Sequence, residues 1–186
     1  MEKYERICPV EYAGGLDSRV RKLLQGPARM LNGQVRDGMV VLELGCGSGY
    51  FTGEIARRVG MSGKVIAADL QDGMLDIVRK KYKGTDIENR ILLHKCEEDR
   101  IGLTEKVDLV LAFFMVHEVP DKKKMLREIR SLLKPDGSVY IVEFRMHPPK
   151  KSFDAMVDLA RETGFVETGR SGSVLSRAVT LKLTEH

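Results

Sequence analysis

Residues 40–53 read Val-Val-Leu-Glu-Leu-Gly-Cys-Gly-Ser-Gly-Tyr-Phe-Thr-Gly, and they predict a strand, a tight turn and the start of a helix. The apolar run Val40–Leu44 is typical of a buried strand, and residues 50–59 have helical periodicity. The N–H groups at the start of such a helix face the turn, an arrangement that binds nucleotide-like ligands. The stretch therefore predicts a ligand site at the carboxyl end of this strand.

The glycine spacing narrows the class of ligand. Gly45, Gly47 and Gly49 form G-x-G-x-G, whereas the dinucleotide fingerprint G-x-G-x-x-G requires glycine where Tyr50 stands. Glu43 precedes the first glycine by two residues. Its carboxylate would repel a pyrophosphate and attract an ammonium group. The loop therefore favours a ligand with a positive amine over a dinucleotide.

Short apolar strands alternate with amphipathic helices along the rest of the chain. The pattern predicts strands at 64–68, 91–94, 107–113 and 138–144, and helices at 71–81, 121–133 and 152–163. A turn is expected at 134–137, and the final strands 165–169 and 174–183 form a hairpin around Ser171-Gly172-Ser173. We therefore predict an α/β fold with a doubly wound, mostly parallel seven-stranded sheet, a C-terminal antiparallel hairpin and helices on both faces.

The segment Glu43–Gly49 resembles E/D-x-G-x-G-x-G, the first motif of class I S-adenosylmethionine-dependent methyltransferases. The likeness extends over about residues 37–145, and it is closest to the small type 11 and quinone-biosynthesis methyltransferases. The resemblance implies S-adenosylmethionine as cofactor and S-adenosylhomocysteine as product. It also implies that Glu43 and the loop residues hold the methionine part; these residues are Gly45, Cys46, Gly47 and Gly49.

Asp69 follows the second predicted strand, where a carboxylate accepts hydrogen bonds from both hydroxyls of a ribose. Nicotinamide-adenine enzymes use the same device, so Asp69 indicates adenosine without selecting the cofactor. Capping of the next helix is the structural alternative. Leu70 and Met74 either pack on the adenine or fill the core.

The adenine contact is less defined by the sequence. Cys96 stands where the family often has an aspartate after the third strand. We assign the contact to Glu97 and its backbone N–H, with Glu98 as the rival. A solvated acidic loop is the structural alternative.

Phe113, Phe114 and His117 follow the fourth predicted strand, where the resemblance implies an apolar wall beside the methionine part and a path to the acceptor. His117 is the candidate general base, because an imidazole titrates near neutral pH. The alternative is that it only orients the loop. Methyl transfer is an in-line displacement that depends mainly on alignment and exclusion of water, so a base is optional.

Residues 1–36 are predicted to form an N-terminal helical arm or lid, and residues 37–186 the S-adenosylmethionine-binding domain. Tyr12 and Arg19 are the lid and substrate candidates. Only about seven residues link the fifth strand to the next helix, where related enzymes insert a substrate cover. Either the substrate is small or presented by another protein, or the arm or a second subunit supplies that cover. A homodimer therefore stays open, as does a plain N-terminal helix packed on the core.

Composition sets the remaining expectations. The 186 residues carry a net charge of +4 with dispersed Lys and Arg, which disfavours a nucleic-acid partner. No apolar stretch reaches membrane-spanning length and no signal-peptide core is present, so the cytoplasm is expected. The three cysteines, Cys8, Cys46 and Cys96, form no metal or disulfide pattern, and we predict no metal site.

These observations predict an enzyme that transfers a methyl group from S-adenosylmethionine to a small-molecule acceptor. One alternative is a non-catalytic module that binds S-adenosylmethionine or a nucleotide. The other is an NAD(P)-dependent oxidoreductase, which Tyr50, Glu43 and the terminal hairpin argue against.

Overall fold

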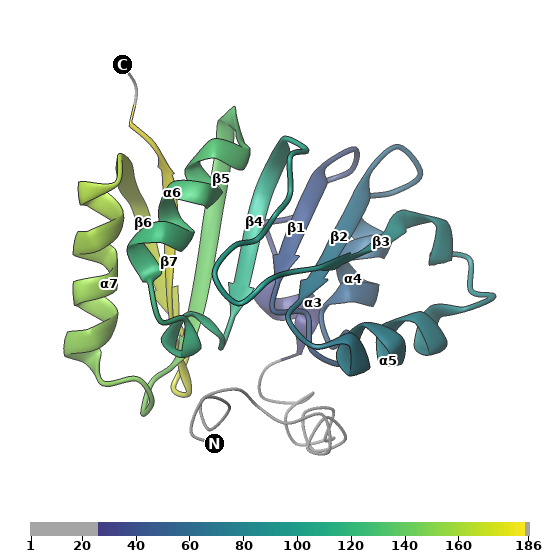
Figure 1. Ribbon diagram of the computed structural model, residues 1–186, viewed down its shortest axis with the longest axis horizontal. Coiled ribbons are helices and arrows are strands. Elements are labelled where there is room, and N and C mark those ends of the chain that lie inside the picture. The colour runs from purple at the N-terminus through teal and green to yellow at the C-terminus, as the bar shows by residue number, and fades with distance from the viewer. Residues whose placement is uncertain (1–25, 185–186) are drawn as a thin grey trace. The chain divides into compact units, whose positions relative to one another are not determined.

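The computed structural model describes residues 26–184 (Figure 1). The chain divides into two compact units, and the first ends at Cys96 while the second begins at Glu97. Tyr12, Arg19 and Cys8 lie outside the described residues, as do residues 1–25 of the predicted arm.

The first unit carries three parallel strands in the order β3-β2-β1. Val41 of β1 pairs with Val65 of β2, and Val65 pairs with Ile91 of β3. The elements in chain order are α3 (Pro27–Met30), β1 (Val40–Leu44), α4 (Thr52–Arg58), β2 (Lys64–Asp69), α5 (Asp72–Tyr82), the 3-10 helix η2 (Glu88–Arg90) and β3 (Ile91–Lys95).

The core of this unit lies along the middle strands, where successive residues are buried on both faces. Val41 and Leu42 of β1 are both fully buried, as expected for a parallel strand covered on two sides. Leu75 and Val78 of α5 pack against Cys46, next to β1. The packing of α5 therefore fixes the loop that follows β1.

The second unit carries four strands in the order β4-β5-β7-β6. β4 and β5 are parallel, and β7 is antiparallel to both β5 and β6. The elements are β4 (Val107–Phe113), the 3-10 helix η3 (Val116–Glu118), α6 (Lys122–Leu132), β5 (Leu133–Phe144), α7 (Lys150–Glu162), β6 (Phe165–Gly172) and β7 (Ser176–Leu183). No helix within residues 26–184 has the length and apolar character needed to cross a bilayer.

The described strands are seven in number and mostly parallel, and the chain ends in an antiparallel hairpin. The predicted fold class is therefore confirmed. Predicted and observed bounds coincide at β1 and β4 and differ by one or two residues at most other elements.

Two local predictions were wrong. Strand β5 begins at Leu133, which pairs with Val107, and pairing resumes at Ser138 with Leu109. The predicted turn at 134–137 is therefore an irregularity inside the strand and does not precede it.

The hairpin turn also lies later than predicted. Gly172 still pairs with Arg177, so β6 extends past the predicted turn. The Ser173 hydroxyl accepts hydrogen bonds from the N–H groups of Leu175 (3.1 Å) and Ser176 (3.2 Å). These bonds place the turn at residues 173–175.

Candidate functional site

The glycine loop after β1 is anchored to the end of β2. The N–H groups of Gly45 and Cys46 both donate to Ala68 O, at 2.9 and 3.0 Å. Gly45, Gly47 and Gly49 have φ angles of 72°, 53° and 74°, in the left-handed region that favours glycine. Glycine at every second position therefore lets the loop backbone adopt the left-handed conformation three times within five residues.

Asp69, at the end of β2, closes this loop from the other side. Its carboxylate is buried and accepts from Gly47 N–H at 2.8 Å and from Gln71 N–H at 2.9 Å. Burial raises the pKa of Asp69, and these backbone hydrogen bonds partly offset the rise. A carboxylate offers about four acceptor positions, so Asp69 retains capacity for two further donors such as the hydroxyls of a ribose.

Glu43 is the penultimate residue of β1 and precedes the first glycine of the loop by two positions. Its side chain is buried and accepts a hydrogen bond from the Thr52 hydroxyl at 2.6 Å. Burial raises the pKa of Glu43 to about 8, and the nearby Asp69 adds to the rise. Glu43 is therefore mostly protonated at pH 7, and a cation bound beside it would favour its ionised form.

The proton on Glu43 makes stability depend on pH. The folded protein holds this proton up to about pH 8, whereas a glutamate in the unfolded chain loses it near its ordinary pKa of 4.5. The free energy of unfolding should therefore fall as pH rises between those values, by roughly 3–5 kcal/mol from this group. Urea unfolding at several pH values should show a shallower fall in Glu43→Gln. The exposed Glu88→Gln is the control, and an equal slope in Glu43→Gln and wild type would contradict the assignment.

Tyr82 of α5 supports the loop from behind. Its hydroxyl donates to Gly49 O at 2.8 Å and accepts from Gly53 N–H at 3.1 Å. A Cβ on Gly53 would lie 2.6 Å from the Tyr82 hydroxyl oxygen, and one on Gly49 would lie 3.0 Å from Val78. Glycine is required at both positions because the tyrosine approaches so closely.

The space in front of the loop is open. A Cβ on Gly47 would meet no atom within 4 Å. The buried hydroxyl of Ser48 has no hydrogen-bond partner among the described residues. An open face beside a buried, unsatisfied hydroxyl is what a polar ligand would occupy.

The other residues of the first unit that were predicted to hold the cofactor differ in how far they are buried. Met74 is buried, and Leu70 is partly buried with its carbonyl accepting from Lys95 Nζ at 2.6 Å. Cys96 is buried, and its N–H donates to Asp69 O at 2.9 Å. Within the first unit, Met74 is therefore part of the buried core. The backbone hydrogen bond holds Cys96 beside Asp69, the residue that closes the loop.

Glu97 and Glu98 belong to the second unit and are exposed. The Glu97 N–H, which the sequence suggested for the adenine, donates to Arg100 O at 3.0 Å, and its carboxylate pairs with the Arg100 guanidinium at 2.5 Å. Both polar groups of Glu97 are thus engaged in a tight local turn. The assignment of the adenine contact to Glu97 or Glu98 stays a prediction.

His117 of η3 is bound on two sides by one buried carboxylate. Glu143, on β5, is 1% exposed; its Oε1 accepts from the His117 backbone N–H at 2.9 Å, and its Oε2 lies 2.8 Å from His117 Nδ1. The carboxylate accepts the Nδ1 proton, so the neutral imidazole carries its lone pair on Nε2. Sequence reasoning missed Glu143, because its partner is 26 positions away and on another element.

The surroundings of the imidazole favour its protonated form. The hydrogen bond that the imidazole donates to Glu143 raises the pKa of His117, burial opposes the rise, and the charges of Glu143 and Glu118 add to it. Nε2 lies 3.9 Å from Glu118 Oε1, beyond hydrogen-bonding distance, and the His147 ring meets the imidazole edge-on with centroids 5.0 Å apart. The arrangement is that of an oriented imidazole able to accept a proton at Nε2.

Phe113 ends β4 and Phe114 follows it, and the two side chains have different surroundings. Phe113 is buried and meets Tyr140 edge-on. Phe114 has φ +57°, which is unusual for a residue with a side chain, and its ring stacks on Phe144 with centroids 4.0 Å apart. The backbone strain at Phe114 is held by its N–H, which donates to Val142 O at 2.7 Å.

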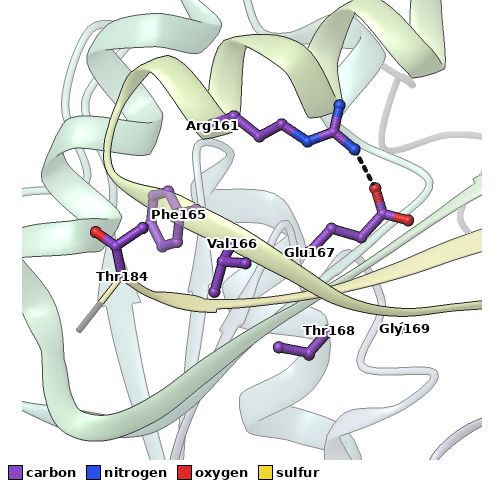
Figure 2. Close-up of a pocket in the computed structure, with 7 residues that line it drawn as sticks. All are labelled: Arg161, Phe165, Val166, Glu167, Thr168, Gly169 and Thr184. Atoms are coloured by element: carbon purple, nitrogen blue, oxygen red, sulfur yellow. Dashed lines mark hydrogen bonds and ion pairs between the residues drawn. The ribbon is translucent and has the colours of Figure 1, made fainter.

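Figure 2 shows a shallow hollow elsewhere on the second unit, between the end of α7 and the β6–β7 pair. Arg161 and Glu167 form an ion pair of 2.6 Å across one side of it. None of the sequence-predicted site residues lines this hollow.

A protein-family model described as "Methyltransferase domain" matches residues 41–137, which is more than half of the chain. The chain belongs to the methyltransferase domain family. The match includes the glycine loop, Asp69 and His117 but ends before Glu143. The family model therefore covers His117 but not Glu143, the residue that holds its imidazole.

Two curated methyltransferases are similar in sequence to part of this chain. A demethylmenaquinone methyltransferase of Lactobacillus johnsonii is 38% identical over 111 residues, which are 59% of this chain and 46% of that protein. The ubiquinone/menaquinone biosynthesis C-methyltransferase UbiE of Idiomarina loihiensis is 35% identical over 111 residues, which are 59% and 44% of the two chains. The chain thus spans about half the length of the curated relatives it matches.

A solved structure agrees with the family assignment at the level of the fold. The crystal structure of a SAM dependent methyltransferase from Aquifex aeolicus superimposes with a TM-score of 0.84, covering 94% of this chain and 98% of that chain. Sequence identity is 22%, so this likeness shows the methyltransferase fold and no more.

Proposed function

We propose that this methyltransferase-family protein transfers a methyl group from S-adenosylmethionine to a small-molecule acceptor by in-line displacement. The observation that carries the proposal is the glycine loop held between Glu43 and the Asp69 carboxylate, with open space before Gly47. Family membership over residues 41–137 supports the same conclusion.

The residues of the first unit fit the parts of S-adenosylmethionine one by one. Asp69 has acceptor capacity for the ribose hydroxyls, and Glu43 offers a carboxylate near the loop for the methionine ammonium. The Gly45–Gly49 backbone and Cys46 lie against the methionine part, and Leu70 and Met74 are the apolar neighbours proposed for the adenine. The sulfonium of the bound cofactor supplies an already activated methyl group.

His117 is proposed to act on the acceptor. Its Nε2 would remove a proton from an acidic hydroxyl of the acceptor, while Glu143 holds the imidazole and stabilises its charged form. Phe114 is proposed as an apolar contact for the acceptor. A base matters for a hydroxyl-bearing ring or an acidic carbon and matters less for a thiolate, so the dyad favours the first two classes.

The relatives narrow the acceptor class further. Their names describe demethylmenaquinone methylation and C-methylation in ubiquinone and menaquinone biosynthesis. We therefore propose a quinol-type ring as the acceptor. Loss of a ring hydroxyl proton to His117 would raise the electron density at the neighbouring ring carbon. That carbon would take the methyl group with S-adenosylhomocysteine as leaving group, and loss of the proton it carried would restore the aromatic ring.

An acceptor screen tests this function. The purified protein is incubated with methyl-labelled S-adenosylmethionine and a naphthoquinol, a thiol or an amine, and both S-adenosylhomocysteine and labelled product are measured. We expect product with the quinol and little with the thiol or the amine. S-adenosylmethionine binding without turnover on any acceptor would instead favour the non-catalytic module.

Several sequence-based expectations stay predictions. They are the arm or lid formed by residues 1–36 with Tyr12 and Arg19, the domain of residues 37–186, a cytoplasmic location, a homodimer and the lack of a nucleic-acid partner. Size-exclusion chromatography with light scattering measures the oligomeric state directly.

A further inference from the structure

Exposed apolar side chains gather at one end of the second unit. Met146 is 93% exposed and Val174 is 86% exposed, and Phe144 and Leu175 are exposed as well. They belong to the end of β5, to the link between β5 and α7 and to the β6–β7 turn, which Figure 1 shows at the same end of this unit. We call these four residues the apolar edge.

Hydrogen bonds join the two segments that carry the apolar edge. The Arg145 N–H donates to Leu175 O at 2.8 Å. The Arg177 guanidinium donates to Pro148 O at 2.9 Å and also to Arg145 O. The exposed side chains therefore stand on one connected platform, and they are not the tips of two independent loops.

The charged residues around the apolar edge are all basic. Residues 144–151 and 170–177 contain Arg145, Lys150, Lys151, Arg170 and Arg177 and no Asp or Glu. Lys150 and Arg170 pair with Asp154 of α7. Arg145, Lys151 and Arg177 form no ion pair with any carboxylate of residues 26–184. Within residues 26–184, three of the five cations near the apolar side chains thus have no ion-pair partner.

We propose that the apolar edge docks this protein on the surface of an anionic membrane. The basic residues would meet lipid phosphates, while Met146 and Val174 would enter the boundary between headgroups and acyl chains. A surface that combines projecting apolar side chains with cations and no acids is complementary to an anionic bilayer. A specific protein partner would instead require a broad matching surface, which two short segments do not provide.

The apolar edge is continuous with the acceptor residues of the same unit. Phe144 stacks on Phe114 at 4.0 Å, and His147, within the β5–α7 link, contacts the His117 ring at 5.0 Å. Docking would bring a membrane-dissolved acceptor close to His117, and this consequence rests on the proposed function. The docking itself goes beyond that function and does not depend on it.

Co-sedimentation with lipid vesicles tests the docking. The full-length protein is mixed with vesicles of equal parts phosphatidylglycerol and phosphatidylcholine, or of phosphatidylcholine alone, without cofactor or acceptor. We expect binding to the anionic vesicles that weakens as salt rises, and much weaker binding to the neutral ones. The double variant Met146→Asp/Val174→Asp should bind at least about tenfold more weakly, and Lys151→Glu should lose roughly tenfold.

Matched variants separate the apolar edge from general surface effects. Met61→Asp changes a methionine of the first unit that is 85% exposed, and Lys80→Glu changes an exposed lysine of α5. Both should bind anionic vesicles as the wild type does. Equal loss in these controls, or no binding of the wild type to anionic vesicles, would overturn the proposal. Self-association through the apolar edge without lipid binding would also overturn it. Because no turnover is measured, these outcomes are independent of the proposed methyl transfer.

Discussion

Asp69→Ala should weaken binding of S-adenosylmethionine by at least about a hundredfold. The change removes acceptors for two ribose hydroxyls, and hydrogen bonds to a charged group are each worth about 1.5–3 kcal/mol. It also releases the Gly47 N–H, which donates to Asp69 at 2.8 Å and shapes the loop. Isothermal titration calorimetry with S-adenosylmethionine and S-adenosylhomocysteine measures the loss.

Asp72→Ala is the matched control for this experiment. Asp72 lies three positions further on, is exposed, and pairs with Lys95 at 2.8 Å. It should bind both ligands as the wild type does. Thermal unfolding of both variants shows whether the domain stays folded, and near-normal affinity in a folded Asp69→Ala would contradict the role of Asp69.

His117→Ala should lower the turnover number by about 10²–10⁴-fold and leave the affinity for S-adenosylmethionine unchanged. The reason is that Nε2 is the proposed proton acceptor, whereas Asp69 and Glu43, the proposed contacts of the ribose and the methionine ammonium, belong to the first unit. Single-turnover kinetics with the active acceptor, alongside calorimetry, separates the two effects. A turnover number close to that of the wild type would restrict His117 to a structural role.

Glu143→Gln tests how His117 is positioned. In the wild type, the backbone N–H and the imidazole Nδ1–H of His117 each donate to a different oxygen of the Glu143 carboxylate. Glutamine offers only one acceptor oxygen for these two donors. Because His117 acts as a base when neutral, wild-type activity should rise with pH through a pKa that lies above the ordinary histidine value. In Glu143→Gln the pKa falls, so the remaining activity should rise at lower pH. An unshifted profile would show that Glu143 does not act through His117.

Local patterns were sufficient to predict the frame of the site. The run Val40–Leu44 and the glycines after it define a strand and a loop through local sterics alone, and the structure has that strand at the predicted residues. Asp69 was predictable for the same reason, since it ends a short apolar strand parallel to the first.

The partners of these residues were not predictable, because they come from distant parts of the chain. Tyr82 supports Gly49 from a different helix, and Glu143 reaches His117 from a strand 26 positions later. An isolated glutamate in an apolar run, such as Glu143 in β5, is a usable signal for a buried functional carboxylate. The β5 start was misjudged because turn-forming residues 134–137 sit inside a strand whose pairing resumes beyond them.

Titration of the wild-type protein with S-adenosylmethionine, S-adenosylhomocysteine and NAD is the most direct test of the methyltransferase account. We predict binding of both sulfur-containing ligands in the micromolar range and no binding of NAD, because the loop reads G-x-G-x-G with Tyr50 where the dinucleotide fingerprint requires glycine. Tight binding of NAD with neither sulfur ligand bound would contradict the account.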